Sequence, residues 1–171
     1  GSVYVFTRSS SDGQFTEQSK LYASDAAAHD HFGISVSLYG DTALIGAFYD
    51  DDDSKTNSGS VYLFTRSSAD YGQFMEQSKL HASDPAVDDM FGISVSLYGD
   101  TALIGAHGVD HNSKTDSGSV YVFTRSSSDG TFTQQSKLHA NDAAVEDYFG
   151  VSVSLYGNTA LIGAHGRDDD N

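Results

Sequence analysis

The chain has 171 residues, 38% of them hydrophobic, and a formal charge of −15 because 24 acidic residues outnumber 9 lysines and arginines. This length allows a buried core, and the charge repels nucleic acid and anionic membranes, so we expect neither as a partner. No apolar run approaches the roughly 20 residues of a membrane-crossing helix, and the lack of cysteine excludes disulfides and thiolate metal sites.

Three copies of one repeat fill the whole chain. A segment reading GSVYVFTRSS or GSVYLFTRSS begins each copy, and a later segment reads FGISVSLYGDTALIGA twice and FGVSVSLYGNTALIGA once. Such self-similarity at a fixed period is the sequence signature of repeat folds. We therefore expect a single repeat region without a second domain, in copies 1–58, 59–117 and 118–171.

The first copy contains four short strand candidates. Residues 2–8 (SVYVFTR) are apolar on both faces, as in a strand packed between two layers. Residues 15–21 (FTEQSKL) carry the charges typical of an outer edge strand. Residues 33–38 (GISVSL) alternate apolar with small side chains, and residues 42–47 (TALIGA) are apolar and small. Joined by glycine-containing turns, they predict an all-β fold of tandem four-stranded antiparallel blades of the propeller type.

The apolar positions of these strands also predict the core. We expect it to form from eight side chains of the first copy and their counterparts in the later copies. The phenylalanine of each Phe-Gly pair should be buried where one blade packs on the next, because the glycine lets backbones approach closely. The eight positions are Val3, Val5, Phe6, Ile34, Val36, Leu38, Leu44 and Ile45, and the phenylalanines are Phe32, Phe91 and Phe149.

The repeated motifs resemble those of a known family. The Phe-Gly opening, the Gly-Ala ending of the TALIGA strand and the following Gly-Ser-Val-Tyr-Val-Phe strand look like FG-GAP repeats, from which integrin-like β-propellers are built. The resemblance extends over all three copies. It implies four-stranded blades arranged around an axis, in extracellular or cell-surface proteins that bind ligands or mediate adhesion.

The sequence departs from this family at the usual calcium loop. Many members carry an Asp-x-Asn-x-Asp-Gly loop between the first two strands of a blade. Here the connection is the short turn at 39–42, with counterparts at 98–101 and 156–159. So short a turn cannot wrap a cation that needs roughly 6–8 oxygen ligands. The family's usual calcium site is therefore not expected in this chain.

In the family's strand order, the blades are out of register with the copies. The chain starts with the last two strands of one blade, contains two complete blades and ends with the first two strands of another. The apolar strands at 2–8 and 159–164 would then be unpaired edges, which favour association. We therefore expect chains to associate head to tail into a ring or fibre, or the array to continue as a longer run of repeats.

Acidic residues concentrate in the loops that an antiparallel meander places on one rim, which holds 17 of the 24 acids and three basic residues. Adjacent carboxylates repel each other, and Ca²⁺ favours the carboxylate and backbone oxygens of such loops. We expect calcium as the only cofactor, with a solvated acidic surface as the alternative. The candidate ligands are Asp50, Asp51, Asp52, Asp53, Asp110, Asp168, Asp169 and Asp170.

Histidines offer a second metal hypothesis. His107 and His111 flank Asp110, an arrangement that suits a transition metal, but Phe48 replaces His107 in the first copy, which favours a packing role. No Ser–His–Asp spacing stands out, and features present in every repeat are usually architectural. We therefore do not expect an enzyme.

Two functional hypotheses follow from these patterns. The first is a non-enzymatic extracellular binding or adhesion module, with a protein or glycan ligand and an acidic, calcium-binding rim. The second is a structural repeat unit whose chains join head to tail into a ring or an extracellular fibre. The size of the native assembly would separate them.

Overall fold

The computed structural model describes residues 1–52, 54–66 and 72–166, and every regular element in these residues is a β-strand. The strands pair antiparallel throughout, which confirms the predicted fold class. They are β1 (Val3–Arg8), β2 (Phe15–Leu21), β3 (Val36–Tyr39), β4 (Thr42–Ala47), β5 (Ser60–Arg66), β6 (Phe74–Leu80), β7 (Ser94–Tyr98), β8 (Thr101–Ala106), β9 (Ser119–Arg125), β10 (Phe132–Leu138), β11 (Ser152–Tyr156) and β12 (Thr159–Gly163).

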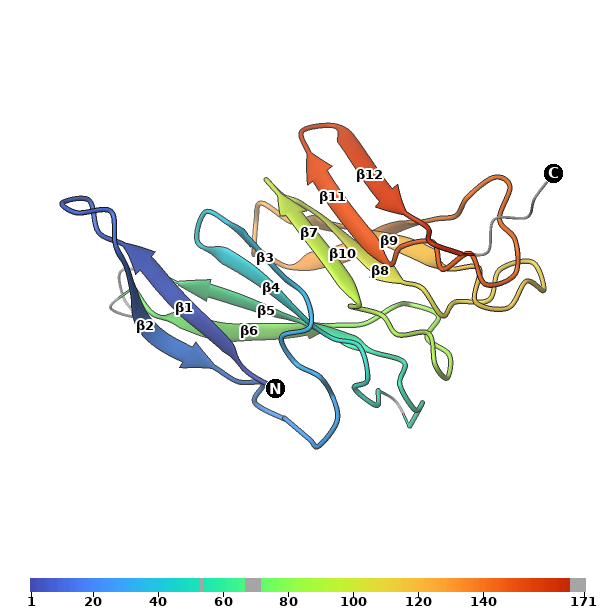
Figure 1. Cartoon of the computed structure of the whole chain (residues 1–171), viewed down its shortest axis with the longest axis horizontal. Helices are drawn as coiled ribbons and strands as arrows, with labels where there is room; N and C mark the ends of the chain where they lie inside the picture. The colour runs from blue at the N-terminus through green and yellow to red at the C-terminus, as the bar shows by residue number, and fades with distance from the viewer. Residues whose placement is uncertain (53, 67–71, 167–171) are drawn as a thin grey trace.

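The strands form four sheets that follow one another along the chain (Figure 1). Two are complete blades, with strand orders β3-β4-β5-β6 and β7-β8-β9-β10, and two are half-blades, β1-β2 and β11-β12. The predicted register is therefore confirmed. The half-blades lie at opposite ends of the row, and the sheets do not close into a ring.

The strand bounds of the first copy match the prediction to within one residue except at the start of β3, which begins at Val36 rather than at residue 33. Gly33 has a φ of 95°, and the Ile34 N–H donates to the carbonyl of His31, so this segment is a turn. A Cβ at Gly33 would lie 2.9 Å from the Ser2 carbonyl oxygen. Glycine is therefore needed here both for the left-handed conformation and for the close approach of the two backbones.

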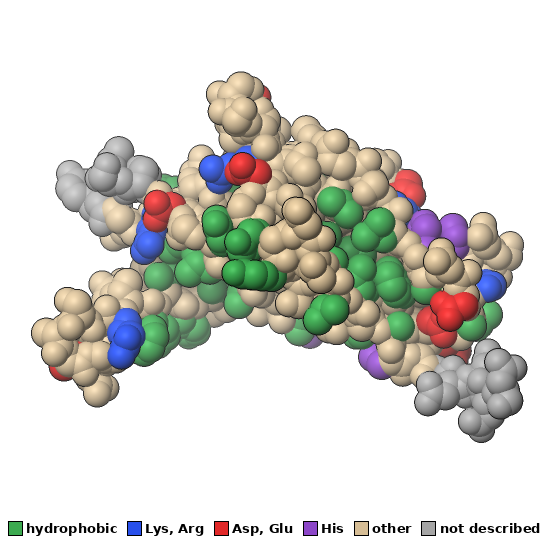
Figure 2. Space-filling model, turned by 90° about the horizontal axis from the view of Figure 1, so that it is seen from above, with side chains coloured by type: hydrophobic (Ala, Val, Ile, Leu, Met, Phe, Trp, Pro, Cys, Tyr) green, Lys and Arg blue, Asp and Glu red, His purple; other side chains and the backbone are tan. Residues whose placement is uncertain are grey.

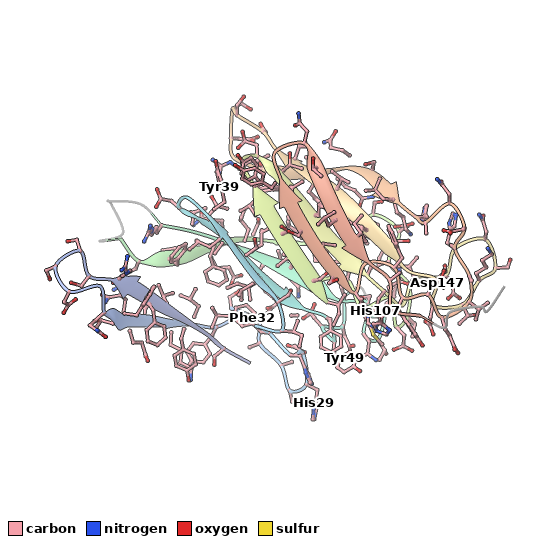
Figure 3. The ribbon with its side chains drawn as sticks, turned by 45° about the horizontal axis from the view of Figure 1, so that its top comes forward. His29, Phe32, Tyr39, Tyr49, His107 and Asp147 are labelled. Atoms are coloured by element: carbon pink, nitrogen blue, oxygen red, sulfur yellow. The ribbon has the colours of Figure 1, made fainter. Side chains whose placement is uncertain are left out.

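Phenylalanine rings fill the boundaries between blades, as predicted. Phe91 is fully buried and meets Tyr121 and Phe123 edge-on, with ring centres 5.3 and 6.0 Å apart. Phe32 is buried in the same way between the β1–β2 half-blade and the first complete blade (Figure 3). Phe149 is only half-buried, because the β11–β12 half-blade lacks the strands that would complete its pocket.

Several side chains predicted to be in the core are instead exposed. Val36 and Leu38 are 59% and 62% exposed, whereas their counterparts in the next copy, Val95 and Leu97, are buried. The prediction was likewise wrong for Phe6, Ile34 and Leu161. All five lie on a half-blade or on the β3 side of the first complete blade, so the neighbours that bury their counterparts are absent. Figure 2 shows hydrophobic side chains reaching the surface on one face of the row.

The backbones of adjacent blades approach closely at the glycines of β4 and β8. A Cβ at Gly46 would lie 2.0 Å from the Gly92 carbonyl oxygen, and one at Gly105 would lie 1.9 Å from that of Gly150. The Ser35 hydroxyl donates to the same Gly92 oxygen at 2.7 Å. The glycines of the TALIGA strands thus allow the backbones of neighbouring blades to approach closely.

Candidate functional site

The acidic loops that precede the blades and those that follow β4 and β8 lie on one rim, as the meander topology predicts. In Figure 3, Tyr49 and His107 come from the loops after β4 and β8 and lie toward one end of the blades. His29 and Asp147, from the loops before β3 and β11, lie toward that same end. Tyr39, the last residue of β3 before the turn to β4, lies at the opposite end.

One aspartate in each loop that precedes a blade is used to shape that loop. Asp30, Asp89 and Asp147 each accept a hydrogen bond from the backbone N–H three residues earlier. The donors are Ala27, Ala86 and Ala144, at 2.6, 2.7 and 2.5 Å. Asp30 and Asp89 are buried, and burial raises the pKa of the Asp89 carboxyl. These acids therefore support the loops rather than present charge to a ligand.

A second aspartate of the same loops closes each complete blade. The Tyr62 hydroxyl of β5 donates to Asp25 Oδ1 at 2.6 Å, and Lys79 Nζ of β6 lies 2.8 Å from Asp25 Oδ2. The counterpart trio of the next blade is Asp84, Tyr121 and Lys137, with both distances 2.9 Å. We call each trio a polar clamp. It ties a loop that enters a blade to the two strands that end it.

The electrostatics of the polar clamp favour an ionised carboxylate and a neutral tyrosine. Burial, and then the hydrogen bond to Asp25, raise the pKa of Tyr62, so its hydroxyl stays a donor. Burial alone would raise the pKa of Asp25, but its contacts with Lys79 and Tyr62 outweigh burial and lower that pKa. The same balance lowers the pKa of Asp84.

A second contact accompanies each polar clamp. Glu76 of β6 accepts hydrogen bonds from the backbone N–H and the hydroxyl of Ser24, at 2.9 and 2.8 Å. At the counterpart positions, Gln134 of β10 accepts from the Ser83 N–H and donates to its hydroxyl, both at 2.9 Å. Glutamate and glutamine both serve because each has a side-chain oxygen that can accept the backbone N–H.

Among the predicted calcium ligands, Asp50 is committed to partners within the protein. Its carboxylate is buried, accepts a hydrogen bond from Ser60 at 2.6 Å and lies 2.8 Å from Lys79 Nζ. Asp50 thereby joins the polar clamp of the first complete blade. This position carries no free charge for a ligand.

The other predicted ligands within the described residues lie in two loops, Asp51 and Asp52 after β4 and Asp110 after β8. Asp51 accepts the Asn57 N–H at 2.8 Å, Asp110 accepts an N–H at 2.9 Å, and Asp52 lies 2.8 Å from the Nδ1 of a histidine. Among residues 1–52, 54–66 and 72–166, no three acidic or histidine side chains gather in a group that could hold a metal ion. Asp53, Asp168, Asp169 and Asp170 lie outside the described residues.

Several carboxylates line a groove of about 690 Å³ between the loops of the two complete blades. We call it the acidic groove. Its lining includes Asp84, Asp88, Asp89, Asp110, Asp116 and Lys137. Burial, followed by the charges of Asp110, Glu146 and Asp88, raises the pKa of Asp116. Sequence reasoning did not group Asp88 with Asp110 and Asp116, because they lie in two loops of one copy that β7 and β8 separate in the sequence.

The repeated clamps, loops and blades agree with a comparison against known families. The sequence model of the FG-GAP repeat matches residues 15–64, 74–123 and 132–171. The chain belongs to the FG-GAP repeat family. FG-GAP repeats form β-propeller-like modules, typically in extracellular or surface proteins, and are generally non-enzymatic. No curated protein matches the chain significantly in sequence.

The position of the usual FG-GAP calcium loop is occupied here by a two-residue turn with an ion pair. Gly40 has a φ of 58° and allows the tight reversal between β3 and β4. The carboxylate of Asp41 accepts a hydrogen bond from Arg66 Nε at 2.7 Å. Asp100 faces Arg125 in the same way in the next FG-GAP repeat. These residues do not fit a calcium site.

The histidines of the FG-GAP repeats pack rather than converge. His107 lies beside Tyr148, and burial, with a further effect of His165, lowers its pKa. His111 instead stacks on His139, with ring centres 3.6 Å apart. The described residues therefore do not bring His107, His111 and Asp110 together as a metal site.

The part of the chain that the structure describes also contains no helix that could span a membrane.

Proposed function

We propose that this FG-GAP chain is a non-enzymatic extracellular structural module that completes propeller-type blades by joining its two half-blades head to tail. The observation that carries the proposal is that β12 and β1 are the counterparts of strands that pair in both complete blades. In the first blade β4 pairs with β5, from Thr42 with Thr65 to Ala47 with Ser60, and β8 pairs with β9 in the same register.

The exposed side chains of the half-blades support the same contact. Leu161 on β12 is 70% exposed, whereas its counterparts Leu44 and Leu103 are buried. Leu44 packs in one cluster with Val95 and Leu97 of the following blade. By the same geometry, Leu161 of one chain would pack on the exposed β3 face of the next.

An apolar groove of about 370 Å³ lies where β12 of a neighbouring chain would insert. It runs between the β1–β2 half-blade and the first complete blade. Its lining includes Val5, Phe6, Val36, Leu38, Ile45 and Phe74. Filling this groove would bury the apolar edges that remain exposed in a single chain, which is the main source of stability in protein association. Repeats continuing in one polypeptide would make the same contact.

The proposal is tested by the mass of the assembly that the 171-residue chain forms, in sedimentation equilibrium or mass photometry. Two chains of 18.2 kDa would close a six-bladed ring, and longer oligomers would indicate a fibre. Leu161→Arg should dissociate the assembly. Met75→Arg, an exposed apolar position on outer strand β6, is the matched control and should leave it intact. A stable, folded monomer at micromolar concentration would overturn the proposal.

The acidic groove favours a second candidate, a binding or adhesion module that takes a divalent cation or a basic protein or glycan ligand. Burial and then the neighbouring carboxylates raise the pKa of Asp116, and a cation there would relieve the repulsion among these carboxylates. Calorimetric titration with calcium should then give a saturable heat change, and Asp110→Asn in the groove should reduce it, whereas Asp12→Asn on the opposite rim should not. No heat at roughly millimolar calcium contradicts the cation-binding form of this candidate.

A further inference from the structure

Each half-blade carries one part of a polar clamp. The counterpart of Asp25 and Asp84 in the last copy is Asp142, and the structure provides it with neither the tyrosine nor the lysine of a following half-blade. The counterparts of Tyr62 and Lys79 in the first copy are Tyr4 and Lys20. The two chain ends therefore hold the acidic part and the tyrosine–lysine part of the same unit.

We infer that Asp142 of one chain accepts the Tyr4 hydroxyl and the Lys20 ammonium of a second copy, so that a polar clamp specifies the join between half-blades. This inference rests on the head-to-tail joining proposed above. It adds which polar residues select the partner. The apolar groove alone would accept any strand of suitable shape.

The tyrosine–lysine part of this clamp is already arranged in the single chain. Lys20 Nζ lies 4.7 Å from the centre of the Tyr4 ring, and in the complete clamps Lys79 and Lys137 lie 5.2 and 4.8 Å from their tyrosine rings. What differs is burial, since Tyr4 is 50% exposed whereas Tyr62 is fully buried. The arriving aspartate would therefore meet a preformed site and need little rearrangement.

The contact that accompanies each clamp also has its two parts at the two ends. Glu17 of β2 is the counterpart of Glu76, and Asn141 is the counterpart of Ser24. In the join, the Asn141 N–H would donate to the Glu17 carboxylate, as the Ser24 N–H does to Glu76. Both residues are exposed in the single chain.

Specificity follows from the cost of burying an unpaired polar group. Pairing with β12 would bury Tyr4 as deeply as Tyr62, and the buried hydroxyl and Lys20 would then need an acceptor. Asp142 supplies that acceptor. A half-blade without an acidic residue at this position would leave both groups unpaired and would be rejected, which is how buried polar groups discriminate between similar partners.

The test measures association of the unsubstituted 171-residue chain by mass photometry and sedimentation. Asp142→Ala should raise the dissociation constant about tenfold or more, because it leaves the buried donors unpaired. Asp129→Ala, an exposed acid in the turn between β9 and β10 on the opposite rim, is the control of equal charge change and should have no effect. Circular dichroism and thermal unfolding of each variant verify that the fold is intact.

A charge exchange separates the clamp from general electrostatic effects. Lys20→Asp and Asp142→Lys should each weaken association, and the double variant, whose net charge equals that of the native protein, should recover most of it. If the native protein associates but Asp142→Ala behaves like Asp129→Ala, or the double variant shows no recovery, the clamp inference is wrong while head-to-tail joining stands. A monomeric native protein would overturn both.

Discussion

The two complete blades have the same strand order and the same register between their two central strands, but one loop corner differs in its chemistry. In the β3–β6 blade, buried Asp50 contacts Ser60 and Lys79 and adds a second carboxylate to the polar clamp. In the β7–β10 blade, Val109 is buried at the counterpart position. Its carbonyl accepts a hydrogen bond from the N–H of Gly118, as the carbonyl of Asp50 does from that of Gly59. Lys137 is then paired with Asp84 alone.

The neighbouring position of the corner differs in the same manner. Asp52 faces His81 at 2.8 Å in the first blade, whereas in the second blade His111 replaces the aspartate and stacks on His139. One corner thus places a carboxylate beside an imidazole ring, and the other stacks two imidazole rings. The comparison shows that the FG-GAP backbone tolerates an ionic or an apolar corner, because the blade is held elsewhere, by its strands and boundary phenylalanines.

The largest expected effect tests whether the two blades share the same core. Phe32→Ala and Phe91→Ala should each lower the free energy of unfolding by about 3–5 kcal/mol, because each removes a buried ring from an equivalent boundary. Urea denaturation followed by circular dichroism measures both. A difference of several kcal/mol between the two variants would show that the two boundaries are not equivalent.

A smaller effect concerns the ionic corner. Asp50→Ala should cost about 1.5–3 kcal/mol, since it leaves the buried Ser60 hydroxyl without an acceptor and removes one of the two carboxylates of Lys79. Asp50→Val should cost less, because it recreates the apolar corner seen at Val109. Denaturation midpoints in urea measure this, and equal losses for the two variants would show that the corner cannot exchange chemistry.

The smallest effect is a pH dependence confined to the second blade. Burial, and then His111, lower the pKa of His139 below the ordinary value of about 6.5. Because protonation is then harder in the folded state, the penalty is absent above about pH 6.5 and grows as pH falls toward the folded-state pKa. His111→Asp should remove this loss by recreating the Asp52–His81 pair.

Thermal unfolding at pH 7 and pH 5 measures that difference. His107, whose pKa is also lowered, contributes the same loss in both proteins, so comparing native and His111→Asp protein isolates His139. His139→Asn should likewise flatten the profile. An unchanged pH profile in both variants would show that the stacked rings do not influence stability.

Strand order and register followed from the sequence, because repeats fix which segments are equivalent. The start of β3 could not be predicted, because the alternation of apolar and small residues from Gly33 does not reveal that Gly33 has a positive φ and belongs to a turn. Burial at the ends was misjudged for Val36 and Leu38, since identical residues are buried only where a neighbouring blade covers them. Counting charges along the sequence also could not show that Asp50 is paired within the protein. Its partner Lys79 lies in β6, far along the sequence from the loop after β4 that contains Asp50.

The close approach of Gly46 to Gly92, and of Gly105 to Gly150, has a consequence for cooperativity. Each blade touches only its neighbours, so the stability of such an array is the sum of a term for each blade and a term for each boundary, as in a one-dimensional chain of coupled units. The half-blades have a boundary on one side only. Amide hydrogen exchange should therefore be fastest in β1 and β12 and slowest in β4 and β8, with opening that spreads inward from the ends.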